Sequence, residues 1–399
     1  MLNAFLYDGV RSAFGKKGGA LATMRPDDLL GTLLHALVER NDLDPAHIDD
    51  VIVGCANQAG EDSRCVARHA ALAAGLPVSI PGTVVQRNCG SGLGAVISAA
   101  HAITAGEAQL VLSGGVESMS RAPFVIGKAP QAFSSQFTAF DSAVGARFPN
   151  PKVEQMYGND SMPATADNLA REYNISREQT DLFALRSQEN YAAALAEGAF
   201  AREILPVEVL SGRKQASVMV DSDEAPRATT LDALAGLRTL NSNGVTTAGN
   251  ASGMNDGAVG LLVGGEKFGA SAGLSPLARL VASGVAGVEP RLMGIGPVPA
   301  SQLALKRAGL TLDDMDAIEI NEAFSAQVLA CLAGLGLAFD DPRVNSRGGA
   351  IAVGHPLGAS GPRLLLRAVH ELKRRGGRYA LVSMCIGMGQ GIAIVVERL

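Results

Sequence analysis

A cysteine followed by closely spaced glycines is the first candidate for chemistry in this sequence. Cys89 precedes Gly90-Ser91-Gly92, after a short β-branched stretch at 82–85 and before a small-residue helical pattern at 95–105. A thiol at a helix N-terminus meets free N–H groups and the positive end of the helix dipole. We therefore expect its pKa to fall and its thiolate to act as a nucleophile. The alternative is a buried structural cysteine, which is the commoner role of a free thiol.

Three later stretches carry groups that could cooperate with such a nucleophile. His355 lies in a glycine-rich turn at 348–361, and a histidine can accept a thiol proton near neutral pH. Cys385 ends a predicted strand just before three glycines, as expected at the carboxyl edge of a parallel sheet. Asn321 lies at a strand-to-helix junction, where an amide can fix a water or stabilise an oxyanion. The alternative for Asn321 is an ordinary helix N-cap.

Two cysteines and a histidine on glycine-rich turns suggest acyl transfer. One thiolate would take an acyl group as a thioester, and the other would act as acid or base at a carbon atom. The glycines after Cys385 do not indicate a dinucleotide loop, because a strand and not a long helix follows them. The five cysteines are widely spaced and form no CxxC pair, so we expect neither a metal site nor a disulfide framework.

The segments that must position these residues alternate between helices and strands. This alternation favours an α/β fold with parallel strand pairing. A small-residue turn, a helix and a buried strand follow both Cys89 and Gly358, which indicates a duplication that would bring the two turns together across a pseudo-twofold axis. Strands are predicted at 50–54, 108–115, 258–263, 279–285, 316–320, 379–384 and 392–396, and helices at 26–40, 67–74, 176–199, 301–308 and 361–375.

Length and composition limit the possible functions. The 399 residues are too many for one ordinary core, so two domains or two fused halves are expected. The formal net charge of −5 disfavours nucleic acid as a partner. No apolar run approaches the roughly 18 residues of a membrane span, and the first residues do not resemble a signal peptide. We expect no membrane association and a reducing, cytoplasmic location.

Taken together and in order, these stretches resemble the thiolase family over essentially the whole chain. The resemblance implies a duplicated five-layer α-β-α-β-α fold with a loop domain inserted in the first half. The N-terminal half would comprise 1–116 plus 251–270, the inserted loop domain 117–250, and the C-terminal half 271–399. The matching stretches are 88–92, 114–120, 247–253, 321–324, 348–361 and 385–387.

The resemblance implies a role for each candidate. Cys89 would be the acylated nucleophile and His355 its activating base. Cys385 would be the acid and base at the α-carbon of acetyl-CoA. Asn321 would hold a water that forms one oxyanion hole with His355. The backbone N–H groups of Cys89 and Gly387 would form the second oxyanion hole.

The resemblance also implies a coenzyme A site. Ser252 matches the serine that contacts the pantetheine arm, and a basic residue of the loop domain would meet the nucleotide phosphates. Arg227 is the nearest candidate for that residue, with Arg213 and Lys214 as alternatives. Coenzyme A and acyl-CoA enter as substrates, and no permanently bound cofactor or metal is implied. The other residues expected at this site are Met162, Ala251 and Phe324.

Some stretches resemble the branch of the family that acts on 3-oxoadipyl-CoA. Acetoacetyl-CoA thiolases typically carry His-Met-Gly where Ser161-Met162-Pro163 stands in this sequence. A dicarboxylate substrate needs a cation for its distal carboxylate, and Arg121 and Lys128 are candidates. Specificity for acetoacetyl-CoA or for 3-oxoacyl-CoA substrates in general remains the alternative. The stretches of this branch are 54–62, 121–128, 160–163 and 286–291.

Two other functions are compatible with the same fold. Decarboxylating condensing enzymes usually use a Cys-His-His or Cys-His-Asn set, so Cys385 favours a thiolase. A non-catalytic acyl-CoA-binding protein would tend to lack the nucleophile or the histidine, yet Cys89 and His355 are both present. The resemblance also implies a homodimer, or a homotetramer joined through the proline-rich loop near 121–150.

Overall fold

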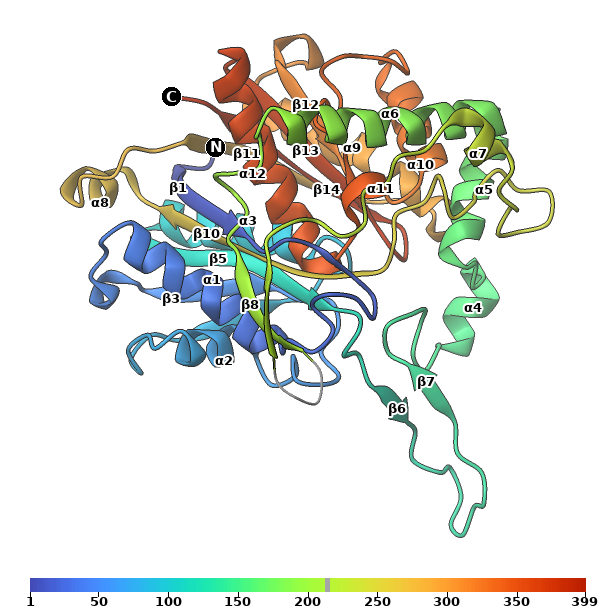
Figure 1. Cartoon of the computed structure of the whole chain (residues 1–399), viewed down its shortest axis with the longest axis horizontal. Coiled ribbons are helices and arrows are strands. Elements are labelled where there is room, and N and C mark those ends of the chain that lie inside the picture. The colour runs from blue at the N-terminus through green and yellow to red at the C-terminus, as the bar shows by residue number, and fades with distance from the viewer. Residues whose placement is uncertain (212–215) are drawn as a thin grey trace.

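The chain folds into two α/β halves that share a central layer of helices (Figure 1). The computed structural model describes residues 1–211 and 216–399. Within the described residues, the main sheet runs in the order β12-β13-β14-β11-β1-β10-β5-β3-β4, and β2 pairs with β10. A single sheet therefore passes through both halves.

The N-terminal half contributes a mixed group of strands. β3 pairs in parallel with β4 and with β5, whereas β10 is antiparallel to both β5 and β1. These strands are β1 (Ala4–Arg11), β2 (Gly15–Lys16), β3 (Asp50–Gly54), β4 (Gly82–Val85), β5 (Leu110–Ser118) and β10 (Asn255–Gly264).

The C-terminal half repeats this mixture. β12 is parallel to β13, and β14 is antiparallel to β13 and to β11. The prediction of parallel pairing is thus wrong for several pairs. Only three residues join β13 to β14, and so short a turn can connect only antiparallel strands. The strands are β11 (Ala278–Gly287), β12 (Ala317–Ile320), β13 (Tyr379–Ile386) and β14 (Gln390–Glu397).

Helices cover the outer faces of the sheet and fill the space between the halves. Apolar side chains of α1 and α2 pack on the N-terminal strands, and those of α9 and α10 pack on the C-terminal strands. Between the halves, α3 and α12 share one core with both sets of strands. This is the predicted α-β-α-β-α layering. The helices are α1 (Pro26–Arg40), α2 (Val66–Ala73), α3 (Ser91–Ala105), α9 (Pro297–Ala308), α10 (Ser325–Leu335) and α12 (Leu357–Arg375).

The N-termini of α3 and α12 meet at very close range. A Cβ atom added to Gly92 would lie 1.9 Å from the carbonyl oxygen of Gly358, and one added to Gly115 would lie 2.0 Å from the same oxygen. Only glycine permits backbones to approach this closely. The two glycine-rich turns are therefore adjacent, as the internal repeat predicts.

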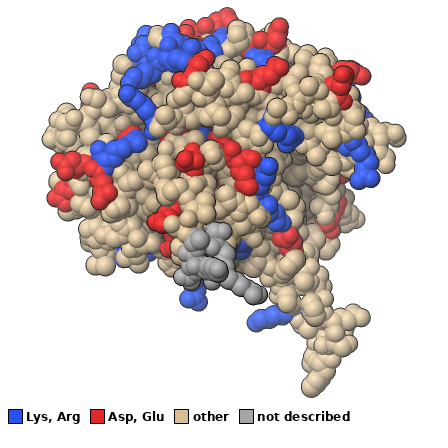
Figure 2. Space-filling model, viewed as in Figure 1, with Lys and Arg blue, Asp and Glu red and all other residues tan. Residues whose placement is uncertain are grey.

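The segment between β5 and β10 carries a projecting arm and several helices (Figure 1). The arm, residues 124–148, includes the β6–β7 hairpin, and its outer part presents an uncharged surface in Figure 2. β5 continues to Ser118 before this segment begins. The division of the chain into 1–116 plus 251–270, 117–250 and 271–399 stays a prediction. The elements are β6 (Phe124–Ile126), β7 (Ala139–Asp141), α4 (Pro151–Tyr157), α5 (Met162–Glu172), α6 (Arg177–Ala196), β8 (Val207–Ser211), β9 (Ala216–Val220) and α7 (Leu231–Ala235).

Short elements complete the fold. They are the helices α8 (Glu266–Ser271) and α11 (Ala350–Val353), and the 3₁₀ helices η1 (Pro45–His47), η2 (Pro290–Ile295) and η3 (Leu312–Asp314). Among the helices of the described chain, none has both the length and the apolar character needed to cross a bilayer.

The close contact between α3 and α12 predicts that a methyl group added at Gly92 lowers the stability of the protein. Gly92→Ala places a Cβ against the Gly358 carbonyl and should destabilise the protein by about 1–3 kcal/mol, the usual cost of overpacking. Thermal and urea unfolding at matched protein concentration measure the change.

The matched control is Gly94→Ala in the same helix. Its added Cβ would lie 3.3 Å from a side-chain methyl of Val85, and alanine favours helix over glycine by up to about 1 kcal/mol. We expect Gly94→Ala to be neutral or slightly stabilising. Equal stability of the two variants would contradict the proposed tight contact.

Candidate active site

The candidate catalytic residues lie where strands of the C-terminal half end beside the N-termini of α3 and α12. Asn321 follows β12, and Cys385 lies near the end of the parallel neighbour β13. The backbone N–H of Asn321 donates to the carbonyl of Ser383, at 3.0 Å. Cys89 precedes α3 and His355 precedes α12. The fold thus gathers four residues that are widely separated in sequence.

Burial and two backbone N–H groups have opposite effects on the pKa of Cys89, whose side chain is half-buried. Burial has the larger effect and raises its pKa, while the backbone N–H groups of Gly387 and of Cys89 itself lower it. The expectation of a lowered pKa is therefore wrong for the resting protein, because covering by the second half outweighs the helix N-terminus. Both N–H groups nevertheless interact with the Cys89 sulfur, and N–H groups beside a nucleophile are the kind of donor that an oxyanion hole uses.

The neighbouring residue ties the nucleophile turn to the opposite half. Asn88 adopts a positive φ of 44°, and its Nδ2 donates to the Gly387 carbonyl at 3.1 Å. A positive φ is costly for most residues but is tolerated by asparagine. This contact fixes the position of the Gly387 peptide relative to Cys89.

His355 is buried, and hydrogen bonds hold its backbone and its ring. Its backbone N–H donates to Asn255 Oδ1 at 3.1 Å, and its Nδ1 lies 2.6 Å from Ser360 Oγ. The Ser360 hydroxyl donates to the Pro356 carbonyl at 2.9 Å. Since that hydroxyl has one hydrogen, its oxygen accepts from Nδ1–H. Nε2 is then unprotonated and available as a base.

The imidazole of His355 is neutral at physiological pH. Burial, followed by the nearby charge of Arg363, lowers its pKa to about 4. Its Nε2 lies 3.4 Å from Asn321 Nδ2. The Asn321 Oδ1 is buried and finds no hydrogen-bond partner among the residues that the structure describes. A buried amide oxygen of this kind suits a bound water.

The second thiol is more deeply buried than the first. Cys385 packs in a small apolar cluster with Ala166, Met293, Ala323 and Phe324. Burial, followed by the charge of Cys89, raises the pKa of Cys385 well above its usual value. Its resting form is therefore the thiol, which can donate a proton to carbon.

Sequence reasoning missed several buried polar side chains that support the site. Glu117 accepts from the backbone N–H of Ala56 at 3.0 Å, of Asn57 at 2.9 Å and of Gly358 at 2.9 Å. Burial raises its pKa to about 7. Glu117 therefore links the loop after β3 to the first turn of α12. The signal for it was a carboxylate inside an otherwise small and apolar stretch, 114–120.

Two more supporting residues hold the histidine loop. Glu322 accepts from Ser187 Oγ at 2.6 Å, from Asn345 Nδ2 at 2.9 Å and from the Ile351 N–H at 3.1 Å. Asn255, which binds the His355 backbone, also donates to the Gly15 carbonyl at 2.9 Å. No sequence pattern marks Asn255, because its partners are distant in the chain.

The predicted coenzyme A residues form a path from the nucleophile toward the surface. Ala251 bridges to Phe324, and the Ser252 N–H donates to the Ala323 carbonyl at 3.0 Å. Ala251 and Phe324 pack against the cluster that holds Cys385. A Cβ added to Gly387 would lie 3.8 Å from Met162 Sδ. These residues therefore adjoin the catalytic group.

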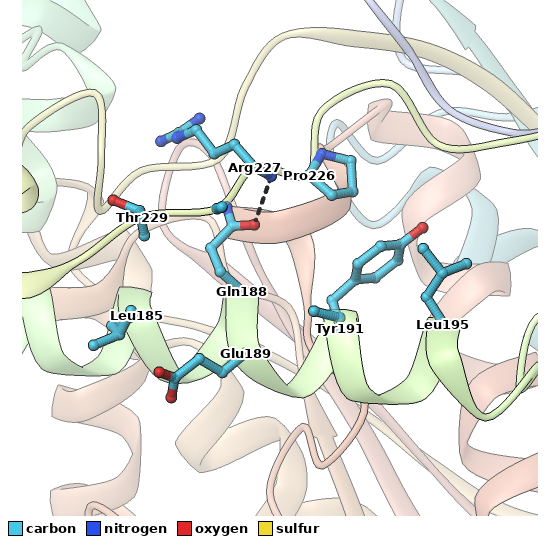
Figure 3. A pocket seen from close by; sticks show the side chains of 10 residues that line it. Leu185, Gln188, Glu189, Tyr191, Leu195, Pro226, Arg227 and Thr229 are labelled. Carbon is cyan, nitrogen blue, oxygen red and sulfur yellow. Dashed lines mark hydrogen bonds between the residues drawn. The ribbon is translucent and has the colours of Figure 1, made fainter.

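Arg227 lies at the exposed end of this path, above a pocket of about 370 Å³ on α6 (Figure 3). Its side chain donates to the Ala248 carbonyl at 3.1 Å, and its backbone N–H donates to Gln188 Oε1 at 3.1 Å. Ala248 begins the stretch that leads to Ser252. The alternatives Arg213 and Lys214 lie outside the described residues.

The structure does not place the two candidate carboxylate-binding cations at the nucleophile. Arg121 forms an ion pair with Glu61, which neutralises its charge. Lys128 is exposed on the arm and lines a surface hollow there. The sequence-based assignment of these cations therefore has no support from the geometry.

Comparisons with known proteins agree with this arrangement. The family model for the thiolase N-terminal domain matches residues 5–267, and the model for the thiolase C-terminal domain matches 274–398. A 3-oxoadipyl-CoA/3-oxo-5,6-dehydrosuberyl-CoA thiolase of Escherichia coli is 57% identical over 100% of both chains. A beta-ketoadipyl-CoA thiolase of Acinetobacter baylyi is 54% identical, also over 100% of both chains.

Solved structures are similar over the full length as well. The crystal structure of the Bacillus anthracis acetyl-CoA acetyltransferase matches with a TM-score of 0.93 and 38% identity, covering 100% of this chain and 99% of that chain. Human mitochondrial 3-ketoacyl-CoA thiolase matches with a TM-score of 0.91 and 39% identity at the same coverage. This chain therefore belongs to the thiolase family, has the thiolase fold, and is an acyltransferase with coenzyme A thioesters as substrates.

Proposed function

We propose that this thiolase cleaves 3-oxoadipyl-CoA with coenzyme A to give succinyl-CoA and acetyl-CoA. Cys89 lies close enough to Cys385 to raise its pKa, and the neutral His355 precedes the helix whose N-terminus contacts that of α3. This arrangement carries the chemistry. The substrate is supported by full-length relatives of that name at 57% and 54% identity, against 44% for an Escherichia coli acetyl-CoA acetyltransferase. The loop Ser161-Met162-Pro163 reaches Gly387, which supports its role in choosing the acyl group.

In the first half-reaction, the Cys89 sulfur attacks the C3 carbonyl of the substrate. The thiol proton passes to His355 Nε2, which the Ser360 contact leaves unprotonated. The C2–C3 bond breaks, and its electron pair stays on C2 of the departing acetyl-CoA. Cys385 donates its proton to C2. The succinyl group remains on Cys89 as a thioester.

In the second half-reaction, the thiol of a new coenzyme A attacks this thioester. Its proton passes to the Cys385 thiolate, which restores the thiol. The bond between the acyl carbon and Cys89 breaks, and the sulfur recovers its proton from His355. Both catalytic groups then have their initial protonation states, and the same steps in reverse would condense the two acyl-CoA molecules.

Two groups of donors would stabilise the oxygen anions formed along the way. The N–H groups of Cys89 and Gly387, which interact with the Cys89 sulfur in the resting protein, would serve one of these anions. A water on Asn321, together with His355, would serve the other. Donors fixed in this way need little reorganisation when charge develops. In the same proposal, the Arg227 guanidinium meets the nucleotide phosphates and Ser252 the pantetheine arm.

We further propose that the protein is a homodimer or homotetramer that works in the cytoplasm. The arm exposes Phe124, Phe133 and Phe137, which would be unusual on a free surface. All five cysteines are free thiols, which supports a reducing compartment.

Purified protein tests the substrate directly. We expect kcat/KM for thiolysis of 3-oxoadipyl-CoA to exceed that for acetoacetyl-CoA by about tenfold or more, equivalent to about 1.4 kcal/mol of transition-state discrimination. Loss of the magnesium–enolate absorbance of the substrate measures the rate. Cys89→Ala should abolish both activities. A preference for acetoacetyl-CoA would refute the proposed substrate but not the thiolase chemistry.

The hydrogen bond between Ser360 and the His355 ring generates a second prediction. Ser360→Ala removes the acceptor of Nδ1–H and should lower kcat by about 10- to 100-fold, because the ring loses its fixed tautomer and orientation. The matched control is Ser98→Ala, which removes a hydroxyl that only bonds to Gly94 within α3. Steady-state kinetics of both variants decide the question. Equal losses would indicate a general packing effect.

The raised pKa of Cys89 generates a third prediction. The alkylation rate follows the thiolate fraction, so a raised pKa means little reaction at pH 7 and a continuing rise above the ordinary thiol value of about 8.5. Peptide mass spectrometry after brief iodoacetamide treatment between pH 6 and 10 measures this residue alone. A plateau already reached below pH 7.5 would instead indicate a resting thiolate.

A further inference from the structure

The proposed substrate has a charged end that the catalytic residues do not bind. A succinyl group on Cys89 ends in a carboxylate two methylene groups beyond the thioester carbon. Enclosing that carboxylate without a partner would cost several kcal/mol, whereas a guanidinium can bind it through two parallel hydrogen bonds. We propose that Arg147 binds this distal carboxylate. The proposal rests on the proposed function, since it assigns the group that selects a dicarboxylate.

Arg147 has a neutral partner, unlike two other arginines of this region that are held in ion pairs. Arg121 pairs with Glu61, and Arg291 pairs with Asp160. Arg147 is half-buried, and its Nη1 donates to the neutral oxygen Asn57 Oδ1 at 3.2 Å. Within the described parts of the chain, no carboxylate lies at ion-pairing distance from it. Its charge is therefore oriented but not neutralised.

A short series of contacts connects Arg147 to the nucleophile turn. Ala56, next to Asn57, accepts from Gln86 Nε2 at 3.4 Å. The same Gln86 Nε2 donates to Asn88 Oδ1 at 3.2 Å, and Asn88 Nδ2 donates to the Gly387 carbonyl. The Gly387 N–H in turn points to Cys89. This series of contacts thus links Arg147 to the turn whose sulfur would hold the acyl group.

The side chains in this series of contacts suit a carboxylate better than an alkyl chain. Asn57, Gln86 and Asn88 present amides, where a pocket for an alkyl chain would be expected to present apolar side chains. An arginine offers five N–H donors in a planar fork, so one contact to Asn57 leaves others for a ligand.

Two other charged residues, Asp62 and Arg87, lie in the same region. Asp62 lies near enough for Arg147 to lower its pKa, yet burial outweighs this effect and raises the pKa overall. Among the described residues, Asp62 and Arg147 form no ion pair. Arg87, two residues before Cys89, reaches Gln390 Oε1 at 3.4 Å and lies beside Gly94, one turn into α3. The Arg87 guanidinium therefore lies beside α3 and the start of β14.

A cycle of two enzymes and two substrates tests the assignment. The substrates are 3-oxoadipyl-CoA and 3-oxohexanoyl-CoA, which have the same six-carbon chain and differ in the terminal carboxylate. Arg147→Gln should lower kcat/KM for 3-oxoadipyl-CoA by about 10- to 100-fold, the usual effect of losing a charge-assisted hydrogen bond. For 3-oxohexanoyl-CoA it should stay within about twofold of the parent protein. Retained activity on this neutral substrate also reports correct folding.

Two further variants sharpen the result. Arg147→Lys keeps the positive charge but lacks the two parallel N–H donors of a guanidinium. It should therefore retain part of the preference for the dicarboxylate. Lys128→Gln removes an exposed cation from the same inserted segment and should leave both substrates unaffected.

The unfavourable outcomes are distinct from one another. Equal losses on both substrates would assign Arg147 a structural role and overturn the proposal. An unchanged preference for 3-oxoadipyl-CoA in Arg147→Gln would also overturn it, while leaving the proposed function in place. A parent protein without preference for 3-oxoadipyl-CoA over 3-oxohexanoyl-CoA would overturn the proposed substrate together with this assignment.

Discussion

The close approach of two helix N-termini is the constraint on which the site depends. Gly92 in α3 and Gly358 in α12 bring their backbones together at a distance that excludes any side chain. Cys89 and His355 each lie just before one of these helices. Their spacing is therefore set by main-chain contact between buried helices, which is more precise than positioning on free loops. Glu117 holds the α12 side of this junction, because it binds the N–H of Gly358 and that of Ala56 in the loop after β3.

Burial then decides the protonation states with which the reaction begins. Covering the site raises the pKa of both thiols and lowers that of His355 to about 4, since each neutral form is favoured away from water. An uncharged resting site can accept an acyl-CoA without first displacing an ion pair. Charge appears only as the thiol transfers its proton, at the moment when the N–H groups of Cys89 and Gly387 can stabilise it.

Much of this fold was predictable from local patterns, and the limits have physical causes. The strands at 50–54 and 82–85 and the helix at 26–40 have the predicted bounds. The helices α3 and α12 begin four residues earlier than predicted, because glycine is tolerated in a first turn whose N–H groups lack intrahelical partners anyway.

Predictions failed where distant residues decide the outcome. The residue types and order around Cys89, His355, Cys385 and Asn321 indicated the candidate site correctly as a spatial group. The direction of the Cys89 pKa shift was wrong, because the second half of the chain buries the thiol. Arg121 was a candidate for binding the distal carboxylate, but the sequence gives no sign that Glu61 pairs with it. Arg147 has no marker in the sequence, because its partner Asn57 lies 90 residues away in the chain.

The strand pair that joins the halves has a mechanical consequence. β1 bonds to β11 through Ala4, Phe5 and Leu6, and adjacent main-chain bonds extend this seam at Leu2 and Leu277. Opening the halves like a hinge would break these bonds and expose the shared core, so hinge bending is a costly route for substrate entry. The two halves should instead behave as one rigid body, and the movement that admits and releases coenzyme A thioesters falls to the inserted segment.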